Sequence, residues 1–190
     1  MRRRTLVLCV LMMLFLSACG ADRTGELLDE ITARYAASPA FDARIAARLE
    51  LTDRTADYVI DWQFRDGQST LTVAEPEEIA GIRCMTDDAG LHFQYEGAVL
   101  TVDPDGEALS PLEALPQLCF GWSGGQVEDC CRETRQDMET LAVTYSHQRG
   151  GADEVQRVWF DTQRLTPVYA EISENGKLVL ACEFLLFQLN

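Results

Sequence analysis

The amino-acid sequence predicts an α+β domain, in which a curved, half-open antiparallel β-sheet carries helices packed on its concave side. Three observations favour this half-barrel of about nine to eleven strands. Apolar residues alternate with a period of two through most of the chain, as in half-buried strands. Hairpin turn pairs stand at 66–67, 150–151 and 175–176. Only two segments, 22–36 and 110–122, have the apolar spacing of a helix.

The two predicted helices are justified by different signals. Residues 22–36 carry charges on one face and apolar side chains on the other, at Leu27, Leu28, Ile31 and Tyr35. In the second helix, Ser110 is the predicted N-cap and Pro111 takes the first helical position. Pro116 is expected to kink or shorten this helix, because proline lacks the N–H that a helix interior needs.

The strands are predicted from alternation and from the turns between them. In chain order they cover residues 41–51, 55–64, 69–76, 82–85, 91–95, 98–102, 138–148, 154–161, 166–172 and 177–190. The final segment is apolar on both faces. We therefore expect that it lies inside the sheet, or that it has one face against the core and the other against an inserted helix or a ligand.

The N-terminus is predicted to be an export signal. Arg2 to Arg4 form a basic region, and Thr5 to Phe15 form an apolar core too short to span a bilayer as a mature helix. The string Leu16-Ser17-Ala18-Cys19 resembles a bacterial lipobox. Acyl chains such as palmitate on Cys19 would hold the protein on the extracytoplasmic face of a bacterial membrane. The chain then divides into a signal peptide (1–18), a lipidated N-terminus with a short tether (19–23) and a single domain (24–190).

The charge of the chain limits its partners. The net charge is −15, and it becomes −18 once Arg2, Arg3 and Arg4 are removed with the signal peptide. A chain this acidic lacks the electrostatic footprint that nucleic acids and anionic lipid head groups require. We therefore expect no nucleic-acid partner, and a solvated acidic surface that suits solubility or a cationic partner.

The cysteines favour neither a metal site nor a defined disulfide pattern. Cys9 leaves with the signal peptide and Cys19 carries the lipid, which leaves five residues, at Cys84, Cys119, Cys130, Cys131 and Cys182. Export permits one or two disulfides, but five is an odd number and the pairing stays open. The vicinal pair 130–131 lacks the spacing of a zinc site, so we expect no metal and no cofactor.

The string GWSGG, residues 121–125, fits the G-x-S-x-G pattern of a serine hydrolase nucleophile elbow. Such an elbow joins a strand to a following helix, whereas here the predicted helix precedes Ser123. A serine nucleophile also needs a base, and the chain has only His92 and His147. We therefore expect no catalytic residue, and we expect the glycines to end the helix and turn the chain.

The order of these features resembles a known family. After the lipobox come P-E-E-I-A-G at 76–81, Y-E-G at 95–97, S-P-L-E-A-L at 110–115 and the closing segment VWFDTQRLTPVYAEISENGKLVLACEFLLFQLN at 158–190. This arrangement resembles the LolA/LolB-like superfamily of bacterial lipoprotein carrier and sorting proteins, which includes GerS-type germination lipoproteins. The resemblance implies a curved antiparallel sheet with helices acting as a lid, and a concave apolar face that binds acyl chains or another hydrophobic ligand.

Three functional hypotheses stay open at this point. In the first, the half-barrel binds a lipid or other hydrophobic ligand without catalysis, and its candidate lining residues are Ile60, Trp62, Leu71, Leu91, Phe93, Leu100, Trp159, Leu185 and Phe187. In the second, the groove is filled by its own side chains and the domain binds a protein of the cell envelope or spore. The third is a hydrolase using Ser123. A continuous apolar cavity on the concave side would favour the first, and a packed core the second.

Overall fold

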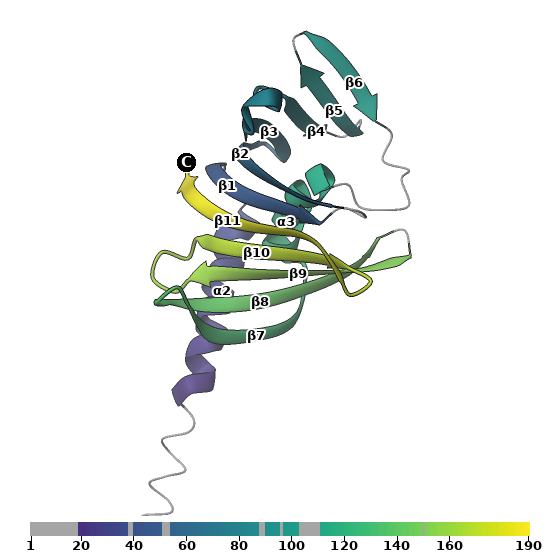
Figure 1. Ribbon diagram of the computed structural model, residues 1–190. Helices are drawn as coiled ribbons and strands as arrows, with labels where there is room; N and C mark the ends of the chain where they lie inside the picture. Colours follow the sequence, from purple (N-terminus) through teal and green to yellow (C-terminus); the bar gives the residue numbers. More distant parts are fainter. Residues whose placement is uncertain are drawn as a thin grey trace, which may run out of the picture.

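The computed structural model describes residues 19–37, 40–50, 54–87, 90–95, 97–102, 111–149 and 151–190 (Figure 1). Within these residues, 11 strands form one open antiparallel sheet, accompanied by two α-helices. The sheet is curved and the helices lie on its concave side, so the predicted α+β fold class is confirmed. The predicted signal peptide 1–18 and the predicted N-cap Ser110 lie outside the described residues.

The sheet consists of two meanders that meet at its centre. The strands are β1 (Phe41–Glu50), β2 (Thr55–Arg65), β3 (Gln68–Glu75), β4 (Arg83–Asp87), β5 (Gly90–Tyr95), β6 (Ala98–Val102), β7 (Gln126–Arg135), β8 (Met138–Arg149), β9 (Ala152–Asp161), β10 (Pro167–Glu174) and β11 (Lys177–Leu189). Their order is β6-β5-β4-β3-β2-β1-β11-β10-β9-β8-β7. A 3-10 turn, η1 (Glu77–Ile79), follows β3. The two meanders are joined because β1 pairs with β11.

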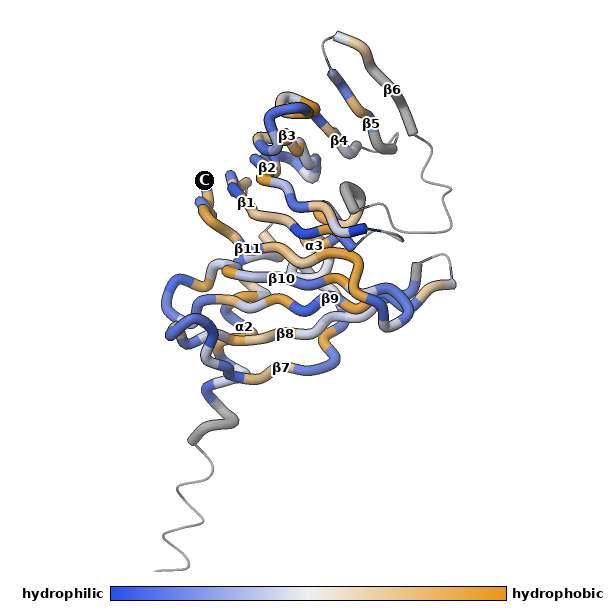
Figure 2. The backbone as a smooth tube through the Cα atoms, viewed as in Figure 1, coloured by the Kyte–Doolittle hydropathy of each residue, from blue (hydrophilic) through white to orange (hydrophobic). Residues whose placement is uncertain are grey.

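Strand β1 shows why this part of the chain forms a sheet. Its odd-numbered residues from Phe41 to Leu49 are buried, and the residues between them are partly or fully exposed. Alternation of this kind places one face on the core and the other toward solvent. In Figure 2, hydrophobic residues gather in the central strands, while the turns that close the hairpins are hydrophilic.

Strand β11 is buried on both faces over its first half, as its composition predicts. Leu180, Ala181 and Cys182 are all buried. Farther along, Arg44 pairs with Leu186 but Ile45 pairs with Phe184, so Leu185 is an extra residue in a β-bulge. The bulge changes the alternation, so that Phe187 and not Leu186 lies beside Ala43.

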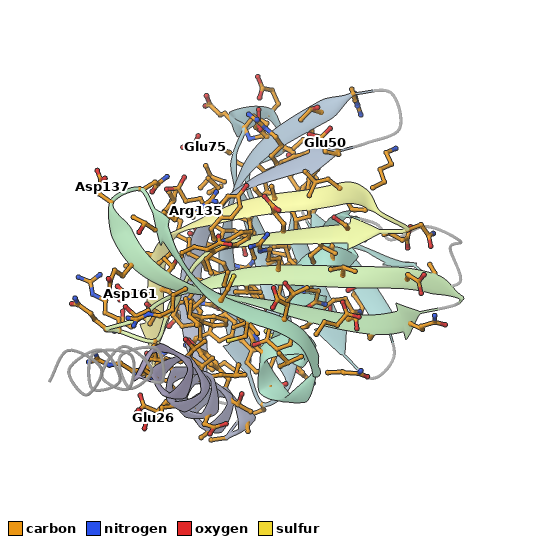
Figure 3. The ribbon with its side chains drawn as sticks, turned by 90° about the horizontal axis from the view of Figure 1, so that it is seen from below. Glu26, Glu50, Glu75, Arg135, Asp137 and Asp161 are labelled. Atoms are coloured by element: carbon orange, nitrogen blue, oxygen red, sulfur yellow. The ribbon has the colours of Figure 1, made fainter. Side chains whose placement is uncertain are left out.

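The helices α2 (Cys19–Ala36) and α3 (Pro111–Gly124) cover the concave face (Figures 1 and 3). Helix α2 buries Ile31 and Tyr35, and the ring of Tyr35 stacks on that of Trp122 from α3 at 5.4 Å. The hydroxyl of Tyr35 donates a hydrogen bond to the carbonyl of Leu165 at 2.9 Å, which ties α2 to the loop before β10. Helix α3 is not shortened at Pro116, and it continues to Gly124.

Candidate functional site

The concave face is the surface on which the sequence predicts a ligand groove. Ile60, Trp62 and Leu71 lie on it, from β2 and β3, and all three are buried. The indole of Trp122 lies nearly parallel to that of Trp62, with ring centroids 6.3 Å apart and planes inclined by 19°. The indole nitrogen of Trp62 donates to the hydroxyl of Ser69 at 3.1 Å, so its polar atom is also satisfied. Over these residues the concave face is a packed core.

Aromatic rings extend this core along β11. Phe187 is half-buried and packs against Phe41 at 4.9 Å, and Phe41 stacks on Phe64 at 5.3 Å. Leu185, at the bulge, is 53% exposed and lies outside the packed core. Phe93 of β5 is half-buried and packs against the core. Leu91 and Leu100 lie in β5 and β6, and the structure describes their backbone but not their side chains.

Trp159 lies on the convex face instead, away from the other candidate groove residues. It pairs with Ala142 and Tyr169, one residue out of phase with Phe160, whose side chain is in the core. Its indole nitrogen donates to the carboxylate of Glu133 at 2.8 Å. This hydrogen bond is the main reason that the pKa of Glu133 is below its ordinary value, and the nearby Arg157 guanidinium lowers the pKa by a smaller amount.

Two arginines cover the rings on the convex face. The guanidinium of Arg135 lies 5.0 Å from the ring of Trp159 and 3.5 Å from that of Tyr169. Arg157 lies 4.8 Å from the Trp159 ring and also forms an ion pair with Glu133. Figure 3 labels Arg135 beside the β7–β8 turn. Cation–π contacts and a charge-assisted hydrogen bond therefore bury Trp159 on a face that neither of the described helices covers.

The glycines of GWSGG have a packing role. A Cβ at Gly121 would lie 2.3 Å from the side-chain oxygen of Gln156, so only glycine fits there without a shift. A Cβ at Gly125 would lie 2.7 Å from the carbonyl oxygen of Gly121, to which the amide of Gly125 donates at 2.8 Å. Ser123 lies within helix α3 and not at a strand-to-helix turn, so the local geometry differs from a nucleophile elbow.

A pocket of about 490 Å³ lies between the end of α3 and strand β8. Its lining residues are Gln117, Gly121, Gly125, Tyr145, Ser146 and His147. Behind it, Glu154 and Gln156 of β9 are 1% and 0% exposed on the concave face. The Gln156 amide nitrogen donates to the Gln117 carbonyl at 3.1 Å and to Glu154 Oε1 at 2.8 Å.

Three oxygen atoms in this region have no hydrogen-bond partner among the described residues. They are Tyr145 Oη, Glu154 Oε2 and Gln156 Oε1. His147 Nε2 lies 3.6 Å from Glu154 Oε2, beyond hydrogen-bond distance. Burial raises the pKa of Tyr145 above its ordinary range. Our sequence prediction missed this pocket, although Glu154 and Gln156 share the inward phase of Val158 and Phe160.

A second hollow, of about 510 Å³, lies on the convex face across β2, β1, β11 and β10. Its surface includes small side chains at Ala46 and Ala181, with Tyr169 on one side and Pro76 on the other. The Arg48–Asp57 ion pair, 2.9 Å long and exposed, lies along it.

Four cysteines of the described chain are free thiols and form no disulfide. They are Cys119, Cys130, Cys131 and Cys182. Cys130 packs against the core, while Cys131 Sγ donates to Glu133 on the convex face, so this vicinal pair points to opposite faces. Burial raises the pKa of Cys182 to about 12. In the part of the chain that the structure describes, no three His, Cys, Asp or Glu side chains are grouped to hold a metal ion.

Neither of the two described helices is both long enough and apolar enough to cross a bilayer.

No family model and no curated protein sequence matches the chain. Solved structures with a similar arrangement include a putative outer membrane lipoprotein-sorting protein domain from Vibrio parahaemolyticus, at 10% identity and a TM-score of 0.48, covering 90% of this chain and 93% of that one. A LolA superfamily protein from Nitrosomonas europaea is 12% identical, with a TM-score of 0.43 and coverage of 85% and 93%.

The lipoprotein LppX from Mycobacterium tuberculosis is 12% identical to this chain, with a TM-score of 0.44 and coverage of 84% and 93%. One of these structures bears the name of the superfamily that the sequence resembles. At these identities the likeness concerns the course of the chain, and the ligand or partner must be inferred from this protein's own residues.

Proposed function

We propose that this protein is a non-catalytic lipoprotein of the bacterial cell envelope, anchored through lipid on Cys19, whose domain 24–190 binds another envelope protein. The filled groove carries this proposal. Leu115, Leu118 and Trp122 of α3 are buried against the concave face. An acyl chain entering this space would displace side chains whose burial contributes about 1.5–3 kcal/mol each. A groove closed by its own residues suits an interaction module.

The exposed part of β11 is the surface we assign to the partner. Leu185 and Leu186 are 53% and 56% exposed, although their strand is central in the sheet. Among the described strands, β10 pairs with β11 only as far as Glu183, and β1 alone pairs with it beyond that residue. Exposed apolar side chains where the neighbouring strand stops favour a protein contact. The net charge of −18 that stays after removal of Arg2, Arg3 and Arg4 favours a cationic rim on the partner.

Native mass spectrometry tests whether the groove is filled by the protein itself. The Cys19→Ser chain would be purified gently from an exported preparation and measured before and after incubation with a lipid extract. We expect the mass of the protein alone in both cases. A reproducible extra mass that denaturation releases as a lipid would overturn the filled groove.

Site-specific photo-crosslinking tests the partner surface. A photoreactive residue at Leu186 should give one discrete crosslinked species in intact envelopes, and the additional change Leu185→Asp should abolish it. A photoreactive residue at Lys177, the exposed first residue of β11 at the other end of the strand, is the matched control. Equal crosslinking at both positions, or none at Leu186, would contradict this assignment.

Binding of a hydrophobic ligand is the second candidate, because one element fills the groove. The floor of Ile60, Trp62 and Leu71 is apolar, and the side chains that cover it come largely from α3. Withdrawal of α3 would open an apolar groove without breaking any strand pairing. The released lipid in the mass measurement would select this candidate over the interaction module.

The anchor is tested separately from the partner. Cys19→Ser should move the protein from the membrane fraction to the soluble fraction, because the covalent lipid is the only anchor we propose. Its thermal midpoint should equal that of the wild type. Persistent membrane binding of the variant in a carbonate wash would refute lipid anchoring at Cys19.

A further inference from the structure

We propose that the pocket between α3 and β8 binds a small ligand through a primary ammonium group. The pocket holds about 490 Å³, which is within the range of small-molecule sites. It lies beside the packed groove and far along the sheet from the exposed leucines of β11. The site is therefore separate from the surface assigned to the protein partner.

The chemistry of the ligand follows from the polar atoms near the pocket that have no hydrogen-bond partner among the described residues. The amide hydrogens of Gln156 are engaged by the Gln117 carbonyl and by Glu154 Oε1. What stays without a partner is oxygen: Glu154 Oε2 and Gln156 Oε1, which only accept hydrogen bonds when the carboxyl is ionised, and Tyr145 Oη, which can do either. The region thus has more acceptors than donors.

These atoms are too deeply buried to be ordinary surface groups. Tyr145 is 3% exposed and lines the pocket, and Glu154 is more deeply buried, with Oε2 3.6 Å from the Nε2 atom of His147, another lining residue. Buried polar groups are nearly always hydrogen-bonded, so three unpartnered oxygens in one region indicate that a binding partner completes them.

The glycines of α3 keep this arrangement open. With no Cβ at Gly121, the side chain of Gln156 lies against the helix backbone, and its nitrogen reaches the Gln117 carbonyl. A side chain at Gly121 would push Gln156 aside and would also enter the pocket, which Gly121 lines. This gives the GWSGG string a binding role in addition to its packing role.

A primary ammonium group matches the atoms that are left. It carries three N–H donors and no acceptor, and its charge is opposite to that of the Glu154 carboxylate. The groups that face Glu154 are His147 from β8, Gln156 from its own strand, and Gln117 through Gln156. A neutral hydroxyl would supply a single donor and no charge, so an amine should be preferred over an alcohol of the same size.

Isothermal titration of butylamine and butanol into the purified full chain in detergent tests the proposal. Butylamine should give saturable binding with a dissociation constant of about 10 mM or lower, and butanol should give none in that range. Glu154→Gln keeps the shape and removes the charge, and it should weaken butylamine binding at least tenfold. Glu183→Gln, an exposed carboxylate on the convex face, is the matched control and should bind as the wild type does.

The proposal fails if the folded wild type does not bind butylamine, if butanol binds equally well, or if Glu154→Gln binds unchanged. If circular dichroism shows that Glu154→Gln is unfolded, Tyr145→Phe replaces it as the decisive variant. That change removes a hydroxyl that has no partner in the protein, so the fold should persist while butylamine binding weakens. Unchanged butylamine binding by a folded Tyr145→Phe variant would overturn the proposal on its own.

Discussion

On the concave face, Trp62 and Trp122 are buried by other apolar groups, with two helices above the sheet and ring against ring. On the convex face, Trp159 is 4% exposed although neither α2 nor α3 of the described chain covers it, because Arg135, Arg157 and Glu133 close over its indole. The two faces thus reach almost the same burial of tryptophan by different chemistry. The burial of a tryptophan side chain therefore does not show whether that side chain lies on the face of the sheet that packs against the core.

Because tryptophan is buried by different chemistry on the two faces, the stability of each face should respond to different conditions. Apolar burial on the concave side depends on shape and on area removed from water. Burial on the convex side depends on charges that salt and pH alter. Four substitutions test this contrast, and we give them from the largest expected effect to the smallest.

Trp122→Ala should have the largest effect, because it removes the ring at the centre of the packed groove. We expect the free energy of unfolding to fall by about 3–5 kcal/mol, as for other large-to-alanine changes in cores. Denaturant unfolding followed by circular dichroism measures this. Val127→Ala, at an exposed position of β7, is the control and should change little. A loss below about 1 kcal/mol for Trp122→Ala would mean that α3 does not seal the groove.

Trp159→Ala should lower the free energy of unfolding less, by about 1–3 kcal/mol, because flexible arginines cover the ring and can move into the space. The loss should shrink in about 1 M salt, since the contacts removed are partly ionic. Trp122→Ala should show no such salt dependence. Equal losses for both variants, independent of salt, would remove the distinction between the faces.

Tyr145→Phe should raise the free energy of unfolding by about 1 kcal/mol, because it deletes a buried hydroxyl that has no partner. Tyr35→Phe is the matched comparison on the same concave side. It removes the hydroxyl that donates to the Leu165 carbonyl, so it should lower the free energy of unfolding by a similar amount. Thermal and denaturant unfolding of the two variants should therefore shift in opposite directions.

Glu133→Gln should reduce the acid sensitivity of the protein slightly. The pKa of Glu133 is lowered in the folded state, chiefly by the hydrogen bond from Trp159. Its stabilising contribution is therefore complete above the unfolded pKa of about 4.3 and is lost as pH falls through the folded value. The stability difference between wild type and variant should narrow below about pH 4. The effect is small because Glu133 is partly exposed. A constant difference from pH 6 to pH 3 would contradict it.

Alternation was sufficient to predict the strands that have one face in the core. β1 and β2 were predicted this way, and the two-sided apolar pattern of β11 predicted its central position. Strand β7 was missed, because QVEDCCRETR is an edge strand whose side chains are exposed or half-buried on both faces, which leaves no period of two. Helix α3 was predicted over 110–122 and ends at Gly124, so the shortening expected at Pro116 does not occur, because packing against the core compensates for the lost N–H.

For the candidate groove residues, alternation predicted which side chains share a face but not which face lines the groove. Ile60, Trp62 and Leu71 share the concave face, but alternation within β9 could not decide between the phases of Trp159 and Phe160. That choice depends on the polar groups of neighbouring strands, such as Glu133, which pairing brings together from distant parts of the sequence. The bulge at Leu185 has no sequence signal of its own, because both flanking residues are apolar.

The pairing of β1 with β11 has a consequence for how the protein is made. Just beyond the end of β11, the side chain of Asn190 donates a hydrogen bond to Asp42 of β1, and these residues are 148 positions apart. Until β11 has been exported, one long edge of β1 stays open in the centre of the unfinished sheet. Open edges of this kind invite pairing with other chains, and contacts this distant in sequence form slowly. We therefore expect that the nascent chain depends on a holding chaperone during export. We also expect that a chain truncated within β11 aggregates.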